Sequence, residues 1–364
     1  ARTFGMEGMF RQLGIYSSVG QLYEPQDSDQ VMFYKEQKDG QILEEGINEA
    51  GSFSSWIAAA TSYSNTGIQT IPFYIFYSMF GFQRIGDLAW AAGDSRARGF
   101  LLGATAGRTT LNGEGLQHED GHSHLMSATI PNCVSYDPCF AYELAVIIQN
   151  GLERMVQNQE DVYYYITVMN ENYQHPDMPK GVEKGIIQGI YPFLTSVTKG
   201  PKVQLMGSGV ILREVIEASK LLEKDFGVSA DVFSVTSFTE LRREAQTVER
   251  WNMLNPDKPQ KQSIVQQVVA DQDSPVIAST DYMKSFPEQI ANFLPNKFVA
   301  LGTDGYGRSD SREALRSFFE VDRYYIVIAA LKALVDTKKI EVSTLTKAIK
   351  QYNIDGNKPN PVSH

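Results

Sequence analysis

The sequence is poor in cysteine, in positive charge and in long apolar runs, and each shortage excludes a class of protein. Its two cysteines, Cys133 and Cys139, are too few for a disulfide framework or, by themselves, a zinc knuckle. The 43 acidic residues outnumber the 33 basic ones, and the net charge of -10 opposes binding to nucleic acid or anionic lipid. No uncharged apolar run is long enough to span a membrane, and the opening ARTFGMEGMF lacks the apolar core of a signal peptide. We therefore expect a cytoplasmic protein without nucleic-acid or membrane partners.

The pattern of apolar residues indicates an α/β protein. Apolar runs bounded by turn residues alternate with helix-period segments, which is typical of mostly parallel sheets. Because 364 residues exceed what one core usually supports, we expect two domains. The pattern restarts near residue 200, so the boundary is placed between residues 198 and 199. Residues 1–198 and 199–364 are each expected to form a three-layer α/β/α domain.

Individual elements follow from the same pattern. Strands are predicted over residues 70–74, 99–104, 132–136, 162–169, 203–206, 232–235, 276–279 and 298–301. Helices are predicted over residues 139–155, 211–226, 239–250, 312–319, 324–334 and 344–352. Residues 255–267, NPDKPQKQSIVQQ, are expected to form a surface loop.

Residues 112–124, NGEGLQHEDGHSH, contain three of the five histidines and raise the question of a metal site. Residues 118–122, HEDGH, match the H-E-x-x-H pattern of zinc peptidases, which requires both histidines on one regular helix. Three glycines interrupt the segment, and an interior glycine costs a helix about 1 kcal/mol relative to alanine, so this helix is not expected. A non-helical metal cluster with Asp120, a solvated turn, and acid–base work on an organic ligand remain open.

Six segments carry a family resemblance, in order along nearly the whole chain: ILEEGINEAG, IPFYIFYSMFGFQRIGDLAWAAGD, GRTTLNGEGLQHEDGHSH, VYYYITVMNENY, SVTSFTELRREAQTVERWN and LGTDGYGRSDSREALRSFFEVD. They resemble the homodimeric type of the pyruvate dehydrogenase first component, a thiamine-diphosphate-dependent decarboxylase. More distantly, the chain is similar to the second half of a transketolase. The resemblance implies a pyrimidine-binding domain followed by a transketolase C-terminal-like domain.

The resemblance also implies a reaction and partners. Enzymes of this family oxidatively decarboxylate pyruvate and transfer the acetyl group to lipoyl-lysine, so a homodimer and the lipoyl domain of the acetyltransferase component are expected partners. In the family a further N-terminal region binds the diphosphate and Mg²⁺ through a G-D-G motif followed by two asparagines. The sequence GTDG has no such asparagine pair after it. Thiamine diphosphate and Mg²⁺ are therefore expected to be bound mainly by that missing region, and this chain alone to be inactive.

Five residues are implied in cofactor binding. Glu49 matches the carboxyl group that hydrogen bonds a pyrimidine nitrogen, which requires a protonated side chain in an apolar setting. Phe80 matches the aromatic residue that stacks on the pyrimidine, and Tyr77 a neighbouring ring. Ile47 and Arg84 match further cofactor contacts.

Two histidines are implied in catalysis beside Glu49. His118 matches a family histidine near the substrate-derived atoms, and His124 is similar in position to a transketolase histidine. The loop GTDGYGRSD, which contains Arg308, is interpreted as a structural turn without a ligand. Two alternatives remain: a non-catalytic chain that only dimerises or assembles, and a zinc peptidase built on HEDGH.

Overall fold

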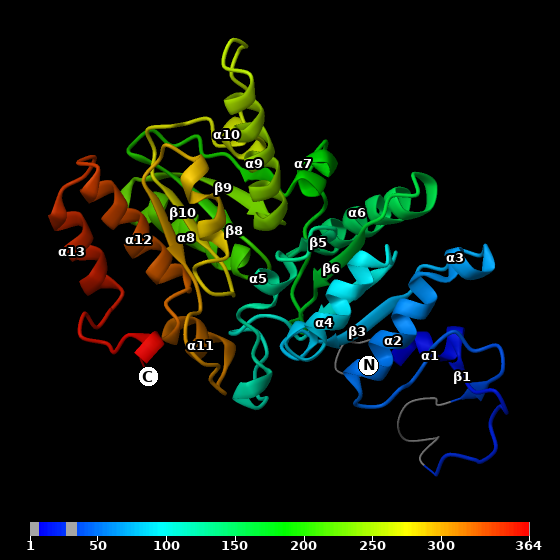
Figure 1. Cartoon of the computed structure of the whole chain (residues 1–364). Helices are drawn as coiled ribbons and strands as arrows, with labels where there is room; N and C mark the ends of the chain where they lie inside the picture. Colours follow the sequence, from blue (N-terminus) through cyan, green and yellow to red (C-terminus); the bar gives the residue numbers. More distant parts are fainter. Residues whose placement is uncertain (1–6, 27–34, 364) are drawn as a thin grey trace.

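Two sheets of mostly parallel strands organise the chain (Figure 1). The structure is a computed structural model that describes residues 7–26 and 35–363. Figure 1 shows one sheet in the blue-to-green half of the chain and the other in the green-to-red half, with helices against both. Within the described ranges, no helix is both long and apolar enough to cross a membrane. The predicted α/β class with mostly parallel sheets is confirmed.

The first sheet has four parallel strands in the order β3-β4-β6-β5. They are β3 (Phe73–Tyr77), β4 (Phe100–Ala104), β5 (Cys133–Tyr136) and β6 (Tyr163–Thr167). All four predicted strands are present, although β3 begins at residue 73 rather than 70. Every residue of β6 is buried, as expected for a strand covered on both faces.

Three helices accompany this sheet: α2 (Glu49–Ala60), α4 (Gly81–Asp94) and α6 (Ala141–Leu152). Only α6 was predicted, and its last turn continues as a π-helix over Glu153–Gln157. Helices α2 and α4 pack with Phe76 and Tyr163 in one apolar core. They matter for function because both begin beside the carboxyl end of β3.

The second sheet has the order β11-β10-β8-β9-β7. Its strands are β7 (Ile190–Leu194), β8 (Lys202–Gly207), β9 (Ser229–Val235), β10 (Val276–Ser279) and β11 (Phe298–Leu301). Strand β7 was not predicted; it is antiparallel, lies at the sheet edge and contains Pro192, which an edge strand tolerates. It belongs to the second sheet although it precedes residue 198, and the domain division at 198 and 199 stays a prediction.

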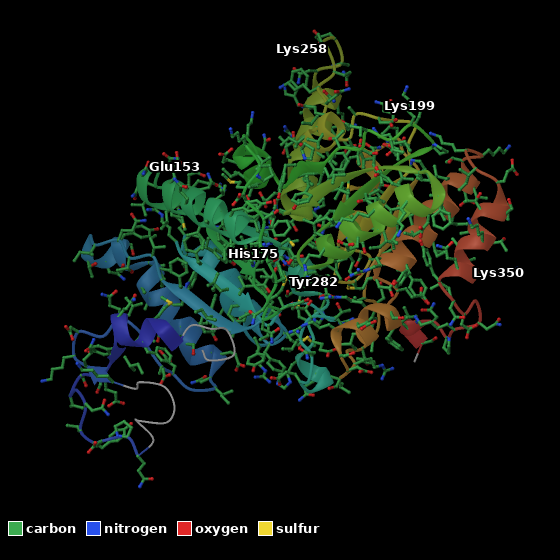
Figure 2. All side chains as sticks on the ribbon, turned by 180° about the vertical axis from the view of Figure 1, so that it is seen from behind. Glu153, His175, Lys199, Lys258, Tyr282 and Lys350 are labelled. Atoms are coloured by element: carbon green, nitrogen blue, oxygen red, sulfur yellow. The ribbon has the colours of Figure 1, made fainter. Side chains whose placement is uncertain are left out.

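The predicted helices of the second half are present as α8 (Ile211–Phe226), α9 (Phe238–Leu254), α11 (Arg312–Phe318), α12 (Arg323–Asp336) and α13 (Val342–Gln351). The loop predicted over residues 255–267 is wrong at its end, where α10 (Ile264–Val268) begins after a capping box at Ser263 and buries Val265. Lys258, labelled in Figure 2, lies at the tip of the projection formed by α9 and α10.

Short elements complete the fold. They are α1 (Glu7–Leu13), β1 (Ile15–Tyr16), β2 (Glu36–Gln37), α3 (Ser62–Thr66), α5 (Ser123–Ser127), α7 (Glu183–Gln188) and 3₁₀ turns at Leu116–His118, Pro287–Phe293 and Pro361–Ser363.

Hydrogen bonds join the two halves of the chain. Arg243 of α9 donates from Nη1 to the Cys133 carbonyl at 2.8 Å and from Nη2 to the Ile130 carbonyl at 2.7 Å. The Ser208 hydroxyl donates to Asp137 Oδ2 at 2.9 Å. Burial raises the pKa of Asp137 to about 7. These polar groups are buried or half-buried, so their pairing fixes how the second half packs on the first.

Candidate active site

Five of the seven residues predicted for the site lie in one cluster at the carboxyl end of β3. The Phe80 ring lies 6.2 Å from the Tyr77 ring and 5.1 Å, edge to face, from the His118 ring. Tyr77 and His118 are 5.3 Å apart between ring centroids. Arg84 Cζ lies 4.1 Å from the Phe80 centroid, and Arg84 Nη1 lies 2.6 Å from Glu49 Oε1. The cluster therefore joins aromatic rings, an imidazole and an ion pair where open α/β sheets commonly bind ligands.

Local backbone features bring these side chains together. The Asn48 side chain accepts a hydrogen bond from Gly51 N at 3.0 Å and caps α2, so Glu49 becomes the first helical residue. Helix α4 begins directly after β3 and Phe80. A Cβ at Gly81 would lie 2.0 Å from the Phe76 ring, so glycine is needed for this close start.

The setting of Glu49 differs from the one that the resemblance implies. Its carboxylate is paired with Arg84, whose side chain is 48% exposed, and 19% of the Glu49 side chain is itself exposed. Ile47, predicted as a cofactor contact, is 97% exposed. The expected apolar shelter is thus not supplied by the described part of the chain, because the nearest partner of the carboxylate is a guanidinium.

His118 lies at the end of a 3₁₀ turn, with 25% of its side chain exposed. Its Nδ1 lies 3.2 Å from the Gly115 carbonyl and 3.9 Å from Glu114 Oε2. The next residue, Glu119, is fully buried, and its Oε2 accepts a hydrogen bond from Arg308 N at 2.7 Å. Burial raises the pKa of Glu119 to about 8. The loop thus exposes an imidazole and buries the adjacent carboxyl group.

His124 lies outside the cluster, in the core between the two halves. It is 0% exposed, its Nε2 lies 2.9 Å from Thr167 Oγ1, and its ring stacks on Phe286 at 4.8 Å. The ring of Tyr282, which is buried and is labelled in Figure 2, meets it edge to face at 4.8 Å. Burial lowers the pKa of His124 to about 4, so the imidazole is neutral at pH 7.

The zinc-peptidase alternative does not fit this segment. His118 ends a 3₁₀ turn, whereas His122 lies at the start of α5, so the two do not share a regular helix. Asp120 accepts hydrogen bonds from the backbone N–H groups of His122 and Ser123 at 3.0 Å. Over residues 7–26 and 35–363, no three His, Cys, Asp or Glu side chains are grouped to hold a metal.

Two residues beside the cluster, Gln83 and Glu119, were not predicted from the sequence. Gln83 Nε2 lies 2.7 Å from His122 Nε2, which joins α4 to the histidine loop. Glu119 contacts Arg308, 189 positions further along the chain. Glutamine inside a helix carries no distinctive signal, and the partner of Glu119 lies in a segment interpreted as a turn. That segment is irregular, with bends at Gly305 and Tyr306, and Asp304 Oδ2 accepts a hydrogen bond from Lys284 N at 3.0 Å.

Comparisons with known proteins agree in both halves of the chain. The family model for the pyruvate dehydrogenase E1 component middle domain matches residues 1–176, and that for the transketolase-like TK C-terminal domain matches residues 189–322. The chain is 66% identical over 364 residues to the pyruvate dehydrogenase E1 component of Pseudomonas aeruginosa and 61% identical over 363 residues to that of Escherichia coli K12. These alignments cover 100% and 99% of this chain but 41% of each relative.

Solved structures of transketolases share the fold. The transketolase from Leishmania mexicana matches with a TM-score of 0.62 and 16% identity, over 98% of this chain and 46% of that one. A split-gene transketolase described as an inactive beta4 tetramer matches with a TM-score of 0.57 and 13% identity, over 92% of this chain and 97% of that one.

Proposed function

This chain belongs to the pyruvate dehydrogenase E1 component family, and from that premise we propose that it supplies the pyrimidine side of a thiamine-diphosphate site for pyruvate decarboxylation. The whole enzyme would act as a cytoplasmic homodimer and transfer the acetyl group to lipoyl-lysine of the acetyltransferase component. Because the chain spans 41% of its curated relatives, binding of the diphosphate and Mg²⁺ is assigned to a further N-terminal region.

The observation that carries the proposal is the cluster at the end of β3. An aminopyrimidine is flat and has ring nitrogens, so it needs an aromatic face and a hydrogen-bonding carboxyl group. Phe80 and Glu49 offer these two features and are joined through Arg84. When bound, thiamine diphosphate supplies a carbon nucleophile and an electron sink for decarboxylation of a 2-oxo acid. The residues present therefore fit the group.

Each residue of the cluster then has a task. Glu49 would hold a proton against a ring nitrogen, and Phe80 would stack on the ring. Arg84 lies on one face of the Phe80 ring and binds Glu49 Oε1. For a pyrimidine to bind, Arg84 must therefore move away, or the pyrimidine must use the other face of the ring and the second carboxyl oxygen of Glu49. His118, whose edge meets Phe80, would donate or accept a proton near the substrate.

A chimera provides the test: this chain replaces the matching 41% of the P. aeruginosa relative, and CO₂ release from pyruvate is measured with thiamine diphosphate and Mg²⁺. We expect Glu49→Gln to lower kcat about 100-fold or more, the range of general acid–base contributions. Glu44→Gln, which changes an exposed carboxylate five residues earlier, is the matched control. Full activity of the Glu49→Gln chimera would contradict the proposed role of Glu49.

A second candidate function is assembly without turnover. It is favoured by the exposure of Ile47 and by the Arg84 ion pair, which leave Glu49 without an apolar shelter in this chain. A chain of the same fold and extent occurs as an inactive tetramer in the split-gene transketolase. Addition of the N-terminal region of the P. aeruginosa relative as a separate polypeptide distinguishes the two candidates. Restored decarboxylation supports the enzymatic role, and assembly without decarboxylation supports the second.

A further inference from the structure

The loop that carries His118 is hydrogen bonded along its length to one distant segment, residues 303–316, which comprises the GTDGYGRSD turn and the first residues of α11. Figure 1 shows the teal histidine loop beside the brown helix α11. The contacts are Arg108 Nη1 to Thr303 O at 2.5 Å and to Gly305 O, Arg308 N to Glu119 Oε2 at 2.7 Å, Ser309 Oγ to Glu114 O at 2.6 Å, and Arg312 Nε to Thr110 O at 2.7 Å.

The two segments also approach each other closely at Gly307. A Cβ built on Gly307 would lie 2.3 Å from the Leu116 carbonyl oxygen and 2.9 Å from Glu119 Cβ. The φ of Gly307 is not in the left-handed region, so an alanine there would be resisted by the neighbouring loop and not by its own backbone. Any side chain at residue 307 would therefore push the histidine loop away.

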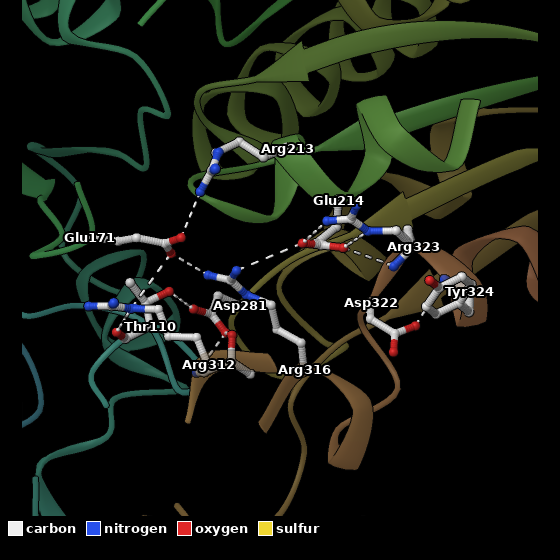
Figure 3. Close-up of polar contacts among 11 residues, drawn as sticks. Thr110, Glu171, Arg213, Glu214, Asp281, Arg312, Arg316, Asp322, Arg323 and Tyr324 are labelled. Atoms are coloured by element: carbon white, nitrogen blue, oxygen red, sulfur yellow. Dashed lines mark hydrogen bonds and ion pairs between the residues drawn. The ribbon is translucent and has the colours of Figure 1, made fainter. Parts of the chain in front are cut away.

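The distant segment is itself firmly anchored (Figure 3). Arg316 of α11 is buried and is hydrogen bonded to Glu171, which also accepts from Arg213 Nη1 at 2.7 Å. Arg312 Nε lies 3.7 Å from the same carboxylate. A carboxylate shared by three guanidinium groups holds α11 against both halves of the chain. The segment is thus a fixed support, against which a glycine-rich loop can be held.

Glu119 has contacts that suit a positioning role better than plain packing. One carboxyl oxygen accepts from Arg308 N, while the other, Oε1, is buried without a hydrogen-bond partner in the described structure. An unpaired buried polar atom costs free energy, so an apolar side chain would pack at least as well. An apolar side chain could not, however, accept the hydrogen bond from Arg308 N, which ties the residue after His118 to the segment 303–316.

We propose that residues 303–316 position His118, with Gly307, Ser309 and Glu119 setting where the imidazole lies against Tyr77 and Phe80. The segment comes from the second half of the chain, whereas Glu49, Tyr77, Phe80, Arg84 and His118 all come from the first. The inference rests on the proposed function, because that function makes His118 a site residue. The position of the His118 ring, however, can be measured without an activity assay. Gly307, Ser309 and Glu119 are positioning residues, because they act through the loop.

The test is NMR of the whole chain labelled at its histidines, with the five imidazole signals assigned by single His→Gln variants. In the native chain we expect the His118 signal to carry ring-current shifts from Tyr77 and Phe80, whose centroids lie 5.3 and 5.1 Å away. We expect Gly307→Ala to shift the His118 signal and weaken its contacts to Phe80. Gly356→Ala is the matched control, since no atom lies within 4 Å of that Cβ. An unmoved His118 signal in the Gly307→Ala chain overturns the proposal.

Milder variants keep the test decisive if Gly307→Ala does not fold. Ser309→Ala removes one exposed hydrogen bond to Glu114 O, and we expect amide hydrogen exchange in residues 112–118 to become about tenfold faster, or about 1.4 kcal/mol. Ser363→Ala, which removes a similar exposed bond to Asn360 O, should leave that exchange unchanged. Glu119→Gln keeps an acceptor and should preserve the His118 signal that Glu119→Leu moves. Equal exchange in the two serine variants, or no difference between the two Glu119 variants, contradicts the proposal.

The result is separable from that of the chimera. If decarboxylation fails in the chimera while Gly307→Ala still moves the His118 signal, the positioning role stands and the proposed function falls. If the chimera is active and the signal does not move, the reverse holds.

Discussion

Burial of His124 predicts that the protein loses stability as pH falls below neutrality. Its pKa is lowered from 6.5 to about 4 by burial, and the ring has no exposed surface. Asp120, the charged group that acts on it, opposes this shift without cancelling it. A group whose pKa is lower in the folded chain than in the unfolded chain binds its proton more tightly when the chain is unfolded, so a fall in pH favours unfolding. Its contribution is therefore fully present above pH 6.5 and lost as pH falls from 6.5 to about 4, by about 3 kcal/mol in total.

The perturbation that isolates this effect is His124→Phe. A phenyl ring can keep the stacking on Phe286, at 4.8 Å in the native chain, but it cannot be protonated. The lost hydrogen bond to Thr167 costs about 1 kcal/mol at any pH, because the Thr167 hydroxyl still donates to Asp137 at 2.7 Å. The variant should therefore be less stable than the native chain at pH 7 and more stable at pH 4.5.

Urea unfolding of the whole chain at half-unit intervals from pH 4.5 to 7.5 measures the difference. Tyr282→Phe is the control: it alters a ring in contact with His124, and burial raises the Tyr282 pKa far above this range, so its effect should not depend on pH. A difference between native and His124→Phe chains that stays constant over the whole pH range would refute the reasoning.

Two further predictions concern Glu119 and Arg243. The pKa of Glu119 is raised from 4.5 to about 8, so its contribution to stability is present below pH 4.5 and is lost as pH rises to about 8. In urea unfolding, Glu119→Gln should remove this pH-dependent loss, which exceeds about 1 kcal/mol. A difference between the native and Glu119→Gln chains that does not depend on pH would contradict the prediction. Arg243→Ala leaves the Cys133 carbonyl without the Arg243 donor and removes one of the two donors to the Ile130 carbonyl, which still accepts from Cys133 N at 3.2 Å. It should cost about 2 kcal/mol, whereas Arg250→Ala on the exposed side of α9 should cost under about 0.5 kcal/mol in the same assay; equal losses would contradict the role of Arg243.

The elements that could be predicted from sequence are those whose pattern is local. Strands β10 and β11 are short apolar runs between turn residues, and α8 ends at Gly227 in a left-handed conformation, so their predicted bounds agree with the structure. Strand β7 was missed because Pro192 argues against a strand, and its pairing with β9 depends on residues about 40 positions away. Helix α4 was missed because its glycines obscure the helical period.

The site divides in the same way. Glu49, Tyr77, Phe80, Arg84 and His118 come from family motifs, and the structure brings them together. Their roles remain predictions. His124 has the same motif origin yet lies in the core, because it is the second residue of α5 and its ring packs against Tyr282 and Phe286 of the second half. Glu119 could not be found from sequence, because its partner lies 189 positions away in an ordinary turn.

The fit between residues 108–119 and residues 303–316 also bears on inheritance and protein engineering. A recombination point anywhere between them, for instance near β8, would combine a histidine loop from one parent with a supporting turn from another. A Cβ at residue 307 would lie 2.3 Å from the Leu116 carbonyl oxygen, so parents that differ at either surface would give hybrids with a displaced imidazole although both halves fold. Hybrids that exchange both segments together would avoid this mismatch, and the two stretches should therefore be treated as one transferable unit.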